Sequence, residues 1–418
     1  MPANYICTLD IGSSKIAACV ARVRGQQIID LFFEVTPSRG VRRGSIIDSI
    51  EFSESVGQLL KKLRQKSGVR IKYVHVGFTG ENIITKHSRS IIPLAERGNK
   101  IITTYDIQRA HQQALILGSN VEEEIIHHLP FSYAIDSSGN VPNPVGLYSH
   151  RLEADVYLVC AKLSYVQTLV HAVNQAGYEA KDVSFNGILA SKIVLGKSEQ
   201  KGIYVVCDVG SDITELLIFN DGVLRHIELF SFGGNDLTAE LAGELKIPFE
   251  LAEAIKKSHG VIGDSSLMNP EKEILFKKED RYEPIKEKVV CEIITSRTKL
   301  FCAKVYDVLG AQVPPYEIKK LFVTGRTMLQ DGFLEQMENI LNVPVEFGKI
   351  TDTNFLSWCA THQDLSGQKY LTYLACLGLL KQILQGDFFT QSKTQPQPGR
   401  NPFLQSLHKI QELYQEYF

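Results

Sequence analysis

The sequence predicts an α/β protein with two related lobes, because one pattern of residues occurs twice at the scale of a domain. Residues 5–15 read as a strand that ends in Asp-x-Gly-Ser, followed by a second strand and a turn at Gly25. Residues 204–214 repeat the pattern, with the next turn at Gly222, and the two Asp-x-Gly cores lie 198 positions apart. Asp-x-Gly alone is common, so two unrelated hairpins are the alternative. The shared length, β-branched flanks and second turn favour an internal duplication.

Strands and helical periods alternate along both halves of the chain, which is the second observation behind the α/β class. In residues 52–66 the apolar side chains recur at the spacing of a helix. Runs rich in β-branched residues lie between such segments and read as strands. We expect further helices at 106–117, 163–176, 235–245 and 248–259, and further strands at 73–78, 179–185 and 321–325. This alternation predicts sheets that are covered by helices.

Length and composition limit the classes of protein to which the chain can belong. Its 418 residues exceed what one hydrophobic core usually organises, which predicts roughly two to three domains. With 44% hydrophobic residues, the chain is too apolar for a disordered protein. Its formal net charge of −2 shows that it lacks the excess of basic residues that a dedicated nucleic-acid binder has. The eight cysteines include no Cys-x-x-Cys pair, so we expect buried residues in a reducing compartment.

The sequence also bears on membrane targeting. The first residues lack the cationic and apolar regions of a signal peptide. The apolar segment 370–384 is shorter than the ~20 residues that a spanning helix needs. We therefore expect the body of the protein to lie in the cytosol.

Residues 85–162 differ in texture from their surroundings and predict an inserted α+β subdomain. They contain a helical segment, strand-like runs and a turn-rich stretch at 136–144. Residues 263–288 are polar and charged, which predicts a surface loop or hairpin. The expected division is a first core subdomain at 1–84 and 163–196, a second core subdomain at 197–232 and 320–389, and a second small subdomain at 233–319.

The end of the chain predicts a linker and an amphipathic helix. Residues 390–401 are polar and rich in proline, which is typical of a flexible linker. Residues 402–418 carry apolar side chains at helical spacing, and a one-sided stripe of this kind predicts a helix in a membrane interface. The alternative is a helix that packs on its own body or on a neighbour. The apolar positions are Phe403, Leu404, Leu407, Ile410, Leu413, Tyr414, Tyr417 and Phe418.

Both Asp-x-Gly-Ser turns have the features of a phosphate-binding hairpin. A tight turn after a strand presents consecutive backbone N–H groups to an anion. Two facing turns could hold the phosphates of a nucleotide from both sides, while Asp10 and Asp208 hold a hydrated Mg²⁺ and Lys15 directs its charge at the phosphates. One such turn alone is as easily an ordinary β-turn, so it is the duplication that favours phosphate binding.

Three further segments follow in an order that suits a nucleoside. Gly233 and Gly234 precede a helix and could admit a ligand at its start, or form a plain strand-to-helix turn. Glu253 and Lys256 share a helix face, where they could bracket a ribose or form a surface ion pair. Gly325 ends a strand beside a helix start, which suits the floor of an adenine site.

Taken in order, the motifs DIGSSK, DVGSDITE, FGGND, AEAIKKSHG and VTGR resemble those of the actin, hexokinase and heat-shock-chaperone ATPase superfamily. The inserted segment, with IIHHLPF, NPVG and RLEADV, resembles the small subdomain of the FtsA family of bacterial cell-division actin homologues. The resemblance covers nearly the whole chain. It implies an actin-like (ribonuclease H-like) duplicated two-lobe fold with an inserted α+β subdomain and a C-terminal amphipathic helix.

For function, the resemblance implies a protein that binds ATP and Mg²⁺ between its lobes and polymerises head to tail. It implies a peripheral protein on the cytoplasmic face of the inner membrane at the division septum, where it binds the C-terminal peptide of FtsZ, tethers the FtsZ ring and recruits later divisome proteins. The ATPase activity implied is weak at most. The nucleotide-site residues that it implies are Asp10, Gly12, Ser13, Ser14, Lys15, Asp208, Gly210, Ser211, Thr214, Gly233, Gly234, Glu253, Lys256 and Gly325.

Two places depart from the superfamily pattern. The second phosphate turn usually reads Asp-x-Gly-Gly-Gly-Thr, whereas its last three positions here are Ser211, Asp212 and Ile213. A carboxylate at Asp212 repels phosphates if it faces them; alternatively it turns outward and Thr214 supplies a hydroxyl. Arg326 replaces a glycine on the adenine side and adds bulk at a close-packed turn.

Three other functions compete with this interpretation. A small-molecule kinase of the same superfamily needs a catalytic base and a substrate pocket, and residues 85–161 supply no obvious one. A chaperone ATPase needs a peptide-binding domain after Leu384, for which the remaining 34 residues are too few. A PilM-like pilus-assembly adaptor also has altered phosphate turns but ordinarily lacks an amphipathic tail, so the tail favours the FtsA type.

Overall fold

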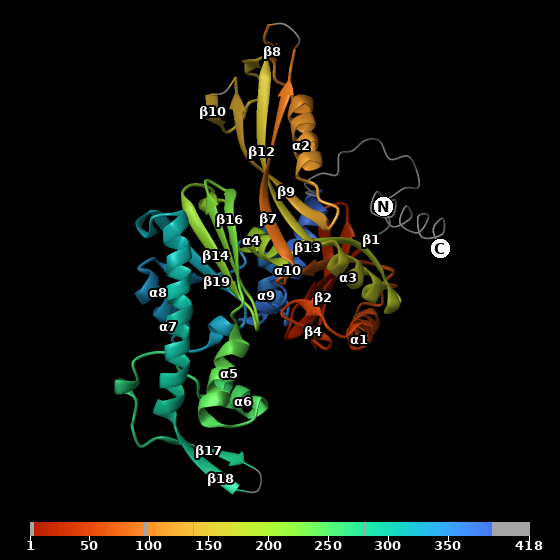
Figure 1. Ribbon diagram of the computed structural model, residues 1–418. Helices are drawn as coiled ribbons and strands as arrows, with labels where there is room; N and C mark the ends of the chain where they lie inside the picture. Colours follow the sequence, from red (N-terminus) through yellow and green to blue (C-terminus); the bar gives the residue numbers. More distant parts are fainter. Residues whose placement is uncertain (1–3, 96–97, 137, 279–280, 387–418) are drawn as a thin grey trace.

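Two five-stranded sheets form the centre of the molecule, one in each lobe (Figure 1). The computed structural model describes residues 4–95, 98–136, 138–278 and 281–386. The predicted linker and terminal helix at 390–418 lie outside the described residues.

The first lobe is built from β1 (Asn4–Ile11), β2 (Lys15–Arg24), β3 (Gln27–Pro37), β6 (Tyr73–Phe78) and β13 (Glu179–Phe185), with helices α1 (Ser49–Ser67), α3 (Leu163–Gln175) and α4 (Asn186–Val194). The strand order is β13-β6-β1-β2-β3. β1 to β3 form an antiparallel meander, and β6 and β13 continue the sheet as parallel strands. A small hairpin of β4 (Val41–Arg42) and β5 (Ser45–Ile46) leads into α1.

The second lobe repeats this plan. Its sheet consists of β14 (Ile203–Val209), β15 (Thr214–Asn220), β16 (Val223–Phe230), β19 (Ile318–Thr324) and β20 (Val345–Phe347), and its helices include α8 (Phe333–Leu341), α9 (Thr353–Thr361) and α10 (Leu374–Gln385). The strand order is β16-β15-β14-β19-β20, again a meander followed by two parallel strands. The α/β class and the internal duplication are therefore confirmed.

The two turns of interest are equivalent in register. Ile11 pairs with Ile16 across β1 and β2, and Val209 pairs with Thr214 across β14 and β15. Each turn therefore spans four residues and directly follows the residue after its aspartate. The equivalence shows that the repeat extends to the register of each hairpin.

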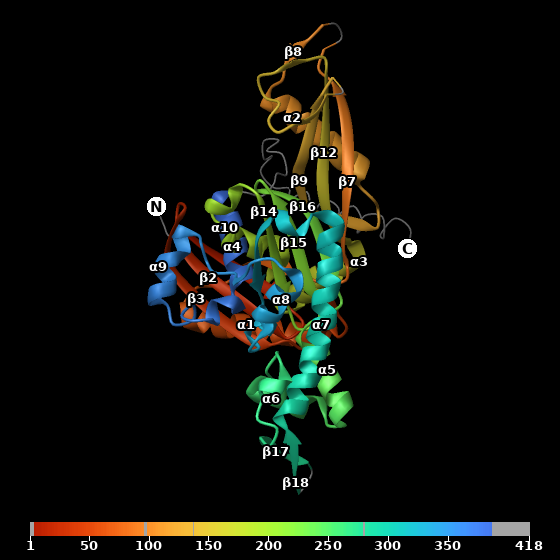
Figure 2. The ribbon, with the colours of Figure 1, turned by 90° about the vertical axis from the view of Figure 1, so that its left-hand side faces the viewer.

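The inserted segment forms a separate sheet at one end of the molecule (Figure 2). It contains β7 (Ile83–Pro93), β8 (Lys100–Ile101), α2 (Thr104–Gly118), β9 (Glu123–Ile135), β10 (Ser138–Val141), β11 (Tyr148–Ser149) and β12 (Arg151–Lys162). The order of the main sheet is β10-β9-β12-β7, and α2 buries Ala110 and Ala114 against it. These small residues let the helix approach the sheet closely.

A second small subdomain lies at the opposite end from the insert (Figures 1 and 2). It contains α5 (Gly234–Leu245), α6 (Phe249–His259), the hairpin of β17 (Glu273–Lys278) and β18 (Arg281–Lys286), and the long helix α7 (Glu287–Gln312). The hairpin falls within the polar segment at 263–288, where a loop or hairpin was expected.

Local signals set the ends of two helices. Asp48 caps α1 by accepting hydrogen bonds from the amides of Ile50 and Glu51, and α1 ends at Gly68 with a φ of 65°. Thr103 and Asp106 form a reciprocal capping box at the start of α2.

Two helices join the lobes. α10 contacts β1, β2 and β6 of the first lobe, whereas α4 contacts β15 of the second. The two helices pack tightly, because a Cβ on Gly378 would lie 2.0 Å from the carbonyl oxygen of Leu189. Seven of the eight cysteines are buried and all are free, in agreement with the expected small buried residues. No helix in the described part of the chain combines the length and hydropathy needed to cross a membrane.

Candidate functional site

The candidate site is built from the two equivalent turns. The amide of Gly12 donates to the carbonyl of Lys15, and the amide of Gly210 donates to the carbonyl of Ile213, both at 3.0 Å. Across the described ranges, no backbone carbonyl accepts the amides of the two residues between, which are Ser13 and Ser14 in the first turn and Ser211 and Asp212 in the second. Both turns therefore have N–H groups that can receive an anion.

The first turn is supported by contacts around Asp10. The ammonium of Lys15 lies 3.1 Å from Oδ2 of Asp10 and donates to the carbonyl of Thr372 at 2.6 Å. Asn186, the first residue of α4, donates its side-chain amide to Oδ1 of Asp10 at 2.7 Å. Both oxygens of Asp10 thus have partners, one of them a cation.

The second turn lies beside two further carboxylates. Asp208 and Glu215 pair directly across β14 and β15. Burial raises the pKa of Asp208, a hydrogen bond from Thr324 opposes the rise, and the charge of Lys15 acts in the same opposing direction. Burial, followed by the charge of Asp208, raises the pKa of Glu215 well above its ordinary value. Three acids, Asp10, Asp208 and Glu215, therefore lie around one lysine beside the two turns.

Several buried oxygens beside the two turns have no hydrogen-bond partner in the described part of the chain. They include Oδ1 of Asn186 and Oε2 of Glu215. Glu215 is only 3% exposed. Buried polar atoms normally have partners, so these mark a place for water, an ion or a ligand. No group of three or more His, Cys, Asp or Glu side chains among the described residues could hold a metal ion.

The start of α5 is bonded to the second turn. The amide of Gly234 donates to the carbonyl of Gly210 at 3.0 Å, and the amide of Asn235 donates to the carbonyl of Ser211 at 2.7 Å. A Cβ on Gly233 would lie 2.4 Å from the carbonyl carbon of Ser211. The glycines thus let the helix approach the turn, and these two helix amides bind the turn itself.

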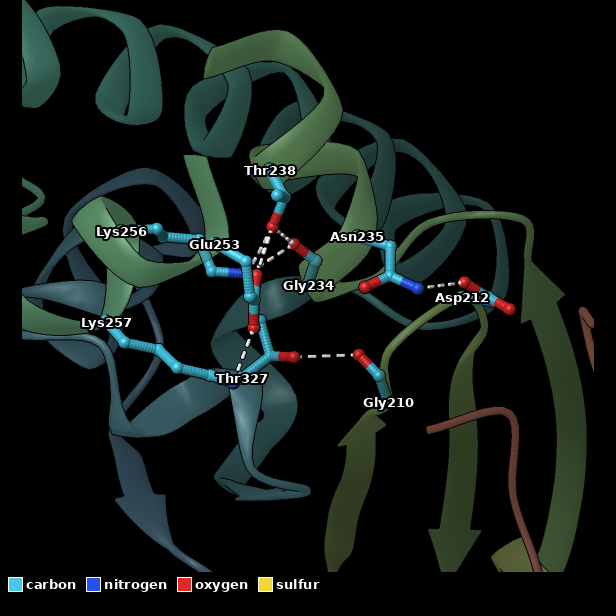
Figure 3. Close-up of polar contacts among 9 residues, drawn as sticks. All are labelled: Gly210, Asp212, Gly234, Asn235, Thr238, Glu253, Lys256, Lys257 and Thr327. Atoms are coloured by element: carbon cyan, nitrogen blue, oxygen red, sulfur yellow. Dashed lines mark hydrogen bonds and ion pairs between the residues drawn. The ribbon is translucent and has the colours of Figure 1, made fainter. Parts of the chain in front are cut away.

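Glu253 and Lys256 form a partly buried network rather than a surface ion pair (Figure 3). The ammonium of Lys256 donates to the carbonyl of Gly234 at 2.7 Å and to the hydroxyl of Thr238 at 2.6 Å, and it lies 2.6 Å from Glu253. Thr238 also donates to Glu253, which pairs with Lys257 at 2.9 Å. Burial lowers the pKa of Lys256, and the bonds from Lys256 and Thr238 outweigh burial to hold the pKa of Glu253 below its ordinary value.

The expected adenine side has a strict glycine position. Gly325 has a φ of 86°, and a Cβ there would lie 2.3 Å from the carbonyl oxygen of Val209. Arg326 adopts a φ of −84° and is exposed, so its side chain does not crowd the turn as its bulk suggested. Thr327 donates its hydroxyl to the carbonyl of Gly210 at 2.7 Å and so ties this segment to the second phosphate turn.

The structure corrects the expectation for Thr214 and shows which donors hold Asp212. Thr214 is fully buried and donates its hydroxyl to the carbonyl of Phe232 at 2.9 Å, so it does not supply a hydroxyl to the cleft. Asp212 is held at both oxygens by protein donors, the amide of Arg43 at 2.9 Å and the side chain of Asn235 at 2.7 Å. Because β-strand side chains alternate, Glu215 rather than Thr214 lies on the cleft side of β15.

Sequence reasoning missed three residues of the site: Asn186, Glu215 and Thr327. One signal was present for Glu215, which is the only charged residue in the otherwise apolar strand TELLIF. Asn186 and Thr327 gave no local signal, because their partners lie 176 and 117 positions away.

A hollow of about 650 Å³ lies beside α7 and α8, away from the two turns. Its lining is mostly polar and includes Asp264, Glu292, Lys299, Glu335 and Gln336. None of the residues expected to bind a nucleotide lines it. It is therefore a separate surface feature.

Comparison with known families matches two models to this chain. Residues 80–160 match the model described as "SHS2 domain inserted in FTSA", and residues 205–375 match "Cell division protein FtsA". Together they cover more than half of the chain. Among curated proteins, the cell division protein FtsA of Neisseria meningitidis serogroup B is 25% identical over 358 residues, which is 85% of this chain and 86% of that protein. The FtsA of Borreliella burgdorferi is 25% identical over 356 residues, 83% and 85% of the two chains.

Solved structures share the fold. A PilM-PilN type IV pilus biogenesis complex matches with a TM-score of 0.61 at 14% identity, over 90% of this chain and 99% of the other. MreB5 of Spiroplasma citri bound to ADP matches with a TM-score of 0.54 at 11% identity, over 92% and 98% of the two chains. At these identities the likeness shows the fold alone, and it confirms the expected actin-like class.

Proposed function

This chain belongs to the FtsA family of cell-division proteins, and from that premise we propose that it binds ATP between its lobes, assembles head to tail and tethers the FtsZ ring to the inner membrane. The observation that carries the nucleotide site is the pair of equivalent turns with available amides. Structures of the same fold bound to ADP and to AMPPNP support this assignment.

In this proposal the turns bind the phosphates. The amides of Ser13 and Ser14 approach them from one lobe, and those around Ser211 approach them from the other. Lys15 contributes a positive charge that its contacts with Asp10 and Thr372 hold in place. Gly325 lets its segment pack closely against Val209 beside the proposed nucleoside position, and Lys256 and Glu253 form a preorganised pair on the same side.

The acidic cluster fits a hydrated Mg²⁺. Magnesium usually keeps several waters, so Asp10 and Asp208 need to reach only those waters. The partnerless oxygens of Glu215 and Asn186 are acceptors for the same water molecules. The bound ion would neutralise phosphate charge, while the protein supplies the carboxylates that orient its hydration shell. Three acids beside one lysine give the site a deficit of positive charge that a divalent cation balances.

The membrane tether rests on the terminal stripe of apolar residues at 402–418. A single interfacial helix binds reversibly, and a filament multiplies the number of helices that bind together. Self-assembly and membrane attachment thus reinforce each other. The insert offers a surface for filament contacts and for later divisome proteins.

A flotation assay with liposomes tests the proposal. Purified full-length chain, FtsZ and ATP are mixed with vesicles of zwitterionic and anionic lipid and then floated. We expect FtsZ to float only with the full chain, and not with a chain that ends before Gln391 or with FtsZ that lacks its C-terminal peptide. A chain that leaves FtsZ at the bottom but binds the N-terminal peptide of a pilus protein would instead identify a PilM-like adaptor. Phosphorylation of a small molecule at the cost of ATP would identify a kinase.

A further inference from the structure

The second phosphate turn contains a negative charge at the position where the first turn has a hydroxyl. Asp212 is equivalent to Ser14, since Asp208 and Gly210 correspond to Asp10 and Gly12. Its Oδ1 accepts from Asn235 at 2.7 Å, a contact drawn in Figure 3. Its Oδ2 accepts from the amide of Arg43 at 2.9 Å. The first donor belongs to the second lobe, and the second belongs to the first lobe, so the carboxylate bridges the lobes.

Arg43 lies in a loop that reaches both turns. The next amide, that of Gly44, donates to the hydroxyl of Ser13 at 2.9 Å. Arg43 has a φ of 49° and Gly44 has a φ of 70°, and a Cβ on Gly44 would lie 2.1 Å from the carbonyl oxygen of Thr79. The turn between β4 and β5 therefore directs two consecutive amides toward the two phosphate turns. One of the pair faces the first turn, and the other is bound to Asp212 of the second.

A weak contact accompanies this bridge. The guanidinium of Arg43 lies 3.7 Å from the carboxylate of Glu81, which accepts from the hydroxyl of Ser231 in the second lobe at 3.0 Å. Arg43 and Glu81 are about half exposed, with side chains 54% and 46% accessible. Exposed pairs of this kind contribute little free energy. This ion pair therefore adds little to the bridge that Asp212 forms.

We propose that Asp212 is an internal substitute for the terminal phosphate of a nucleotide, an inference that rests on the nucleotide site proposed above. Its carboxylate accepts from the amide of Arg43 and so connects the second turn to the first lobe. A triphosphate must displace the carboxylate from this amide and then lie beside its charge. A diphosphate, which is shorter and less charged, leaves the bridge in place. Asp212 thus sets a preference for the nucleoside diphosphate over the triphosphate.

The bridge itself is tested without nucleotide. Hydrogen–deuterium exchange is followed by mass spectrometry in peptides that cover residues 41–46. We expect the Arg43 amide to exchange at least about tenfold faster in Asp212→Ala than in the unaltered protein, because the acceptor is lost. Glu250→Gln, an exposed substitution on α6 that removes the same charge, is the matched control and leaves this peptide unchanged. Equal exchange in Asp212→Ala and the unaltered protein overturns the bridge.

The preference is tested by titration with fluorescent ADP and ATP analogues in the presence of Mg²⁺. Asp212→Asn keeps the shape and removes the charge, and Asp212→Ala removes both. We expect both variants to gain about tenfold in ATP affinity relative to ADP, the size expected for one nearby charge. Circular dichroism and the melting temperature check that both fold. An unchanged ratio of the two affinities overturns the inference. If no variant binds either nucleotide, the proposed nucleotide site fails, whatever the exchange of the Arg43 amide shows.

Discussion

Asn186 donates its side-chain amide to Asp10 at 2.7 Å, although the two residues are 176 positions apart. The bond joins the start of α4, which contacts the second lobe, to the end of β1 in the first. It therefore ties the position of a candidate magnesium-site carboxylate to the helix that connects the lobes. A change in the arrangement of the lobes would therefore move the Asp10 carboxylate through this hydrogen bond.

Removing that bond tests its contribution. We expect Asn186→Ala to lower the free energy of unfolding by about 1–2 kcal/mol, because Asp10 loses a buried donor. Urea unfolding followed by circular dichroism measures the change. Asn354→Ala, at an exposed position on α9, is the control. A loss no larger than that of the control would show that Asp10 needs no support from α4.

Gly187 leaves room for the carboxylate of Glu215. A Cβ at this position would lie 2.5 Å from Oε2 of Glu215 and 2.9 Å from side-chain atoms of Leu217 and Phe185. We expect Gly187→Ala to destabilise the protein by about 1–3 kcal/mol, as overpacking does. Gly243→Ala is the matched control, since this helical glycine has nothing within 4 Å and should gain about 0.5–1 kcal/mol from helix propensity. Thermal unfolding of the two variants should therefore shift in opposite directions, and a shared direction would contradict the packing argument.

The acids of the cleft predict a dependence of stability on pH. The pKa of Glu215 is raised in the folded protein, by burial first and then by the charges of Asp208 and Asp10. Because the pKa of Glu215 is higher in the folded than in the unfolded protein, its contribution to the free energy of unfolding is fully present below the ordinary pKa of 4.5. This contribution is lost as the pH rises through the pKa of the folded protein.

Replacing the acid removes this titration. We expect Glu215→Gln to be more stable than the unaltered protein near pH 7, with the difference shrinking toward pH 4.5. Unfolding by urea at several pH values measures the difference between the two proteins, so that other titrating groups cancel. If the difference in the free energy of unfolding stays constant with pH, Glu215 is not the group whose titration changes the stability.

Nucleotide binding is expected to depend on both turns. Lys15→Ala removes the cation beside Asp10, and a Cβ on Gly210 would lie 2.7 Å from the carbonyl oxygen of Ile213. We expect each of Lys15→Ala and Gly210→Ala to weaken ATP binding by about tenfold or more, since a charge-assisted contact or the turn itself is lost. Isothermal titration with Mg-ATP measures this. Lys61→Ala, exposed on α1, is the control, and equal affinity in all four proteins would indicate a cleft without a nucleotide function.

The terminal segment is expected to bind membranes through its apolar stripe. Leu407→Glu with Ile410→Glu should release the protein from liposomes into the supernatant, because a charge in each apolar position opposes insertion. Gln405→Glu with Gln411→Glu adds the same charge on polar positions and should leave most of the protein in the pellet. Because Lys409 and His408 are offset by Glu412 and Glu416, added salt should have only a mild effect. Unchanged pelleting of the first double variant would exclude the stripe as the anchor.

Local patterns were enough to predict the two hairpins and the class of fold. A turn such as the one from Gly12 to Lys15 depends on residues a few positions apart, and the same is true of the second turn and of the cap that begins α2. Such short-range features can be predicted from neighbouring residues in the sequence. Their repetition at a distance of 198 positions indicated the duplication.

The sequence by itself thus determined the two lobes, the separate insert and the pair of turns, because each follows from local hydrogen bonding and from the alternation of apolar residues. Only the tertiary structure decided which side chains meet at the cleft. It turned Glu215 rather than Thr214 toward the acids, placed Asp212 against the amide of Arg43 from the other lobe, and buried Lys256 beside Glu253. The physical reason is that these contacts join residues from different elements, and their free energy depends on burial and on distances that exist only after the elements have packed together.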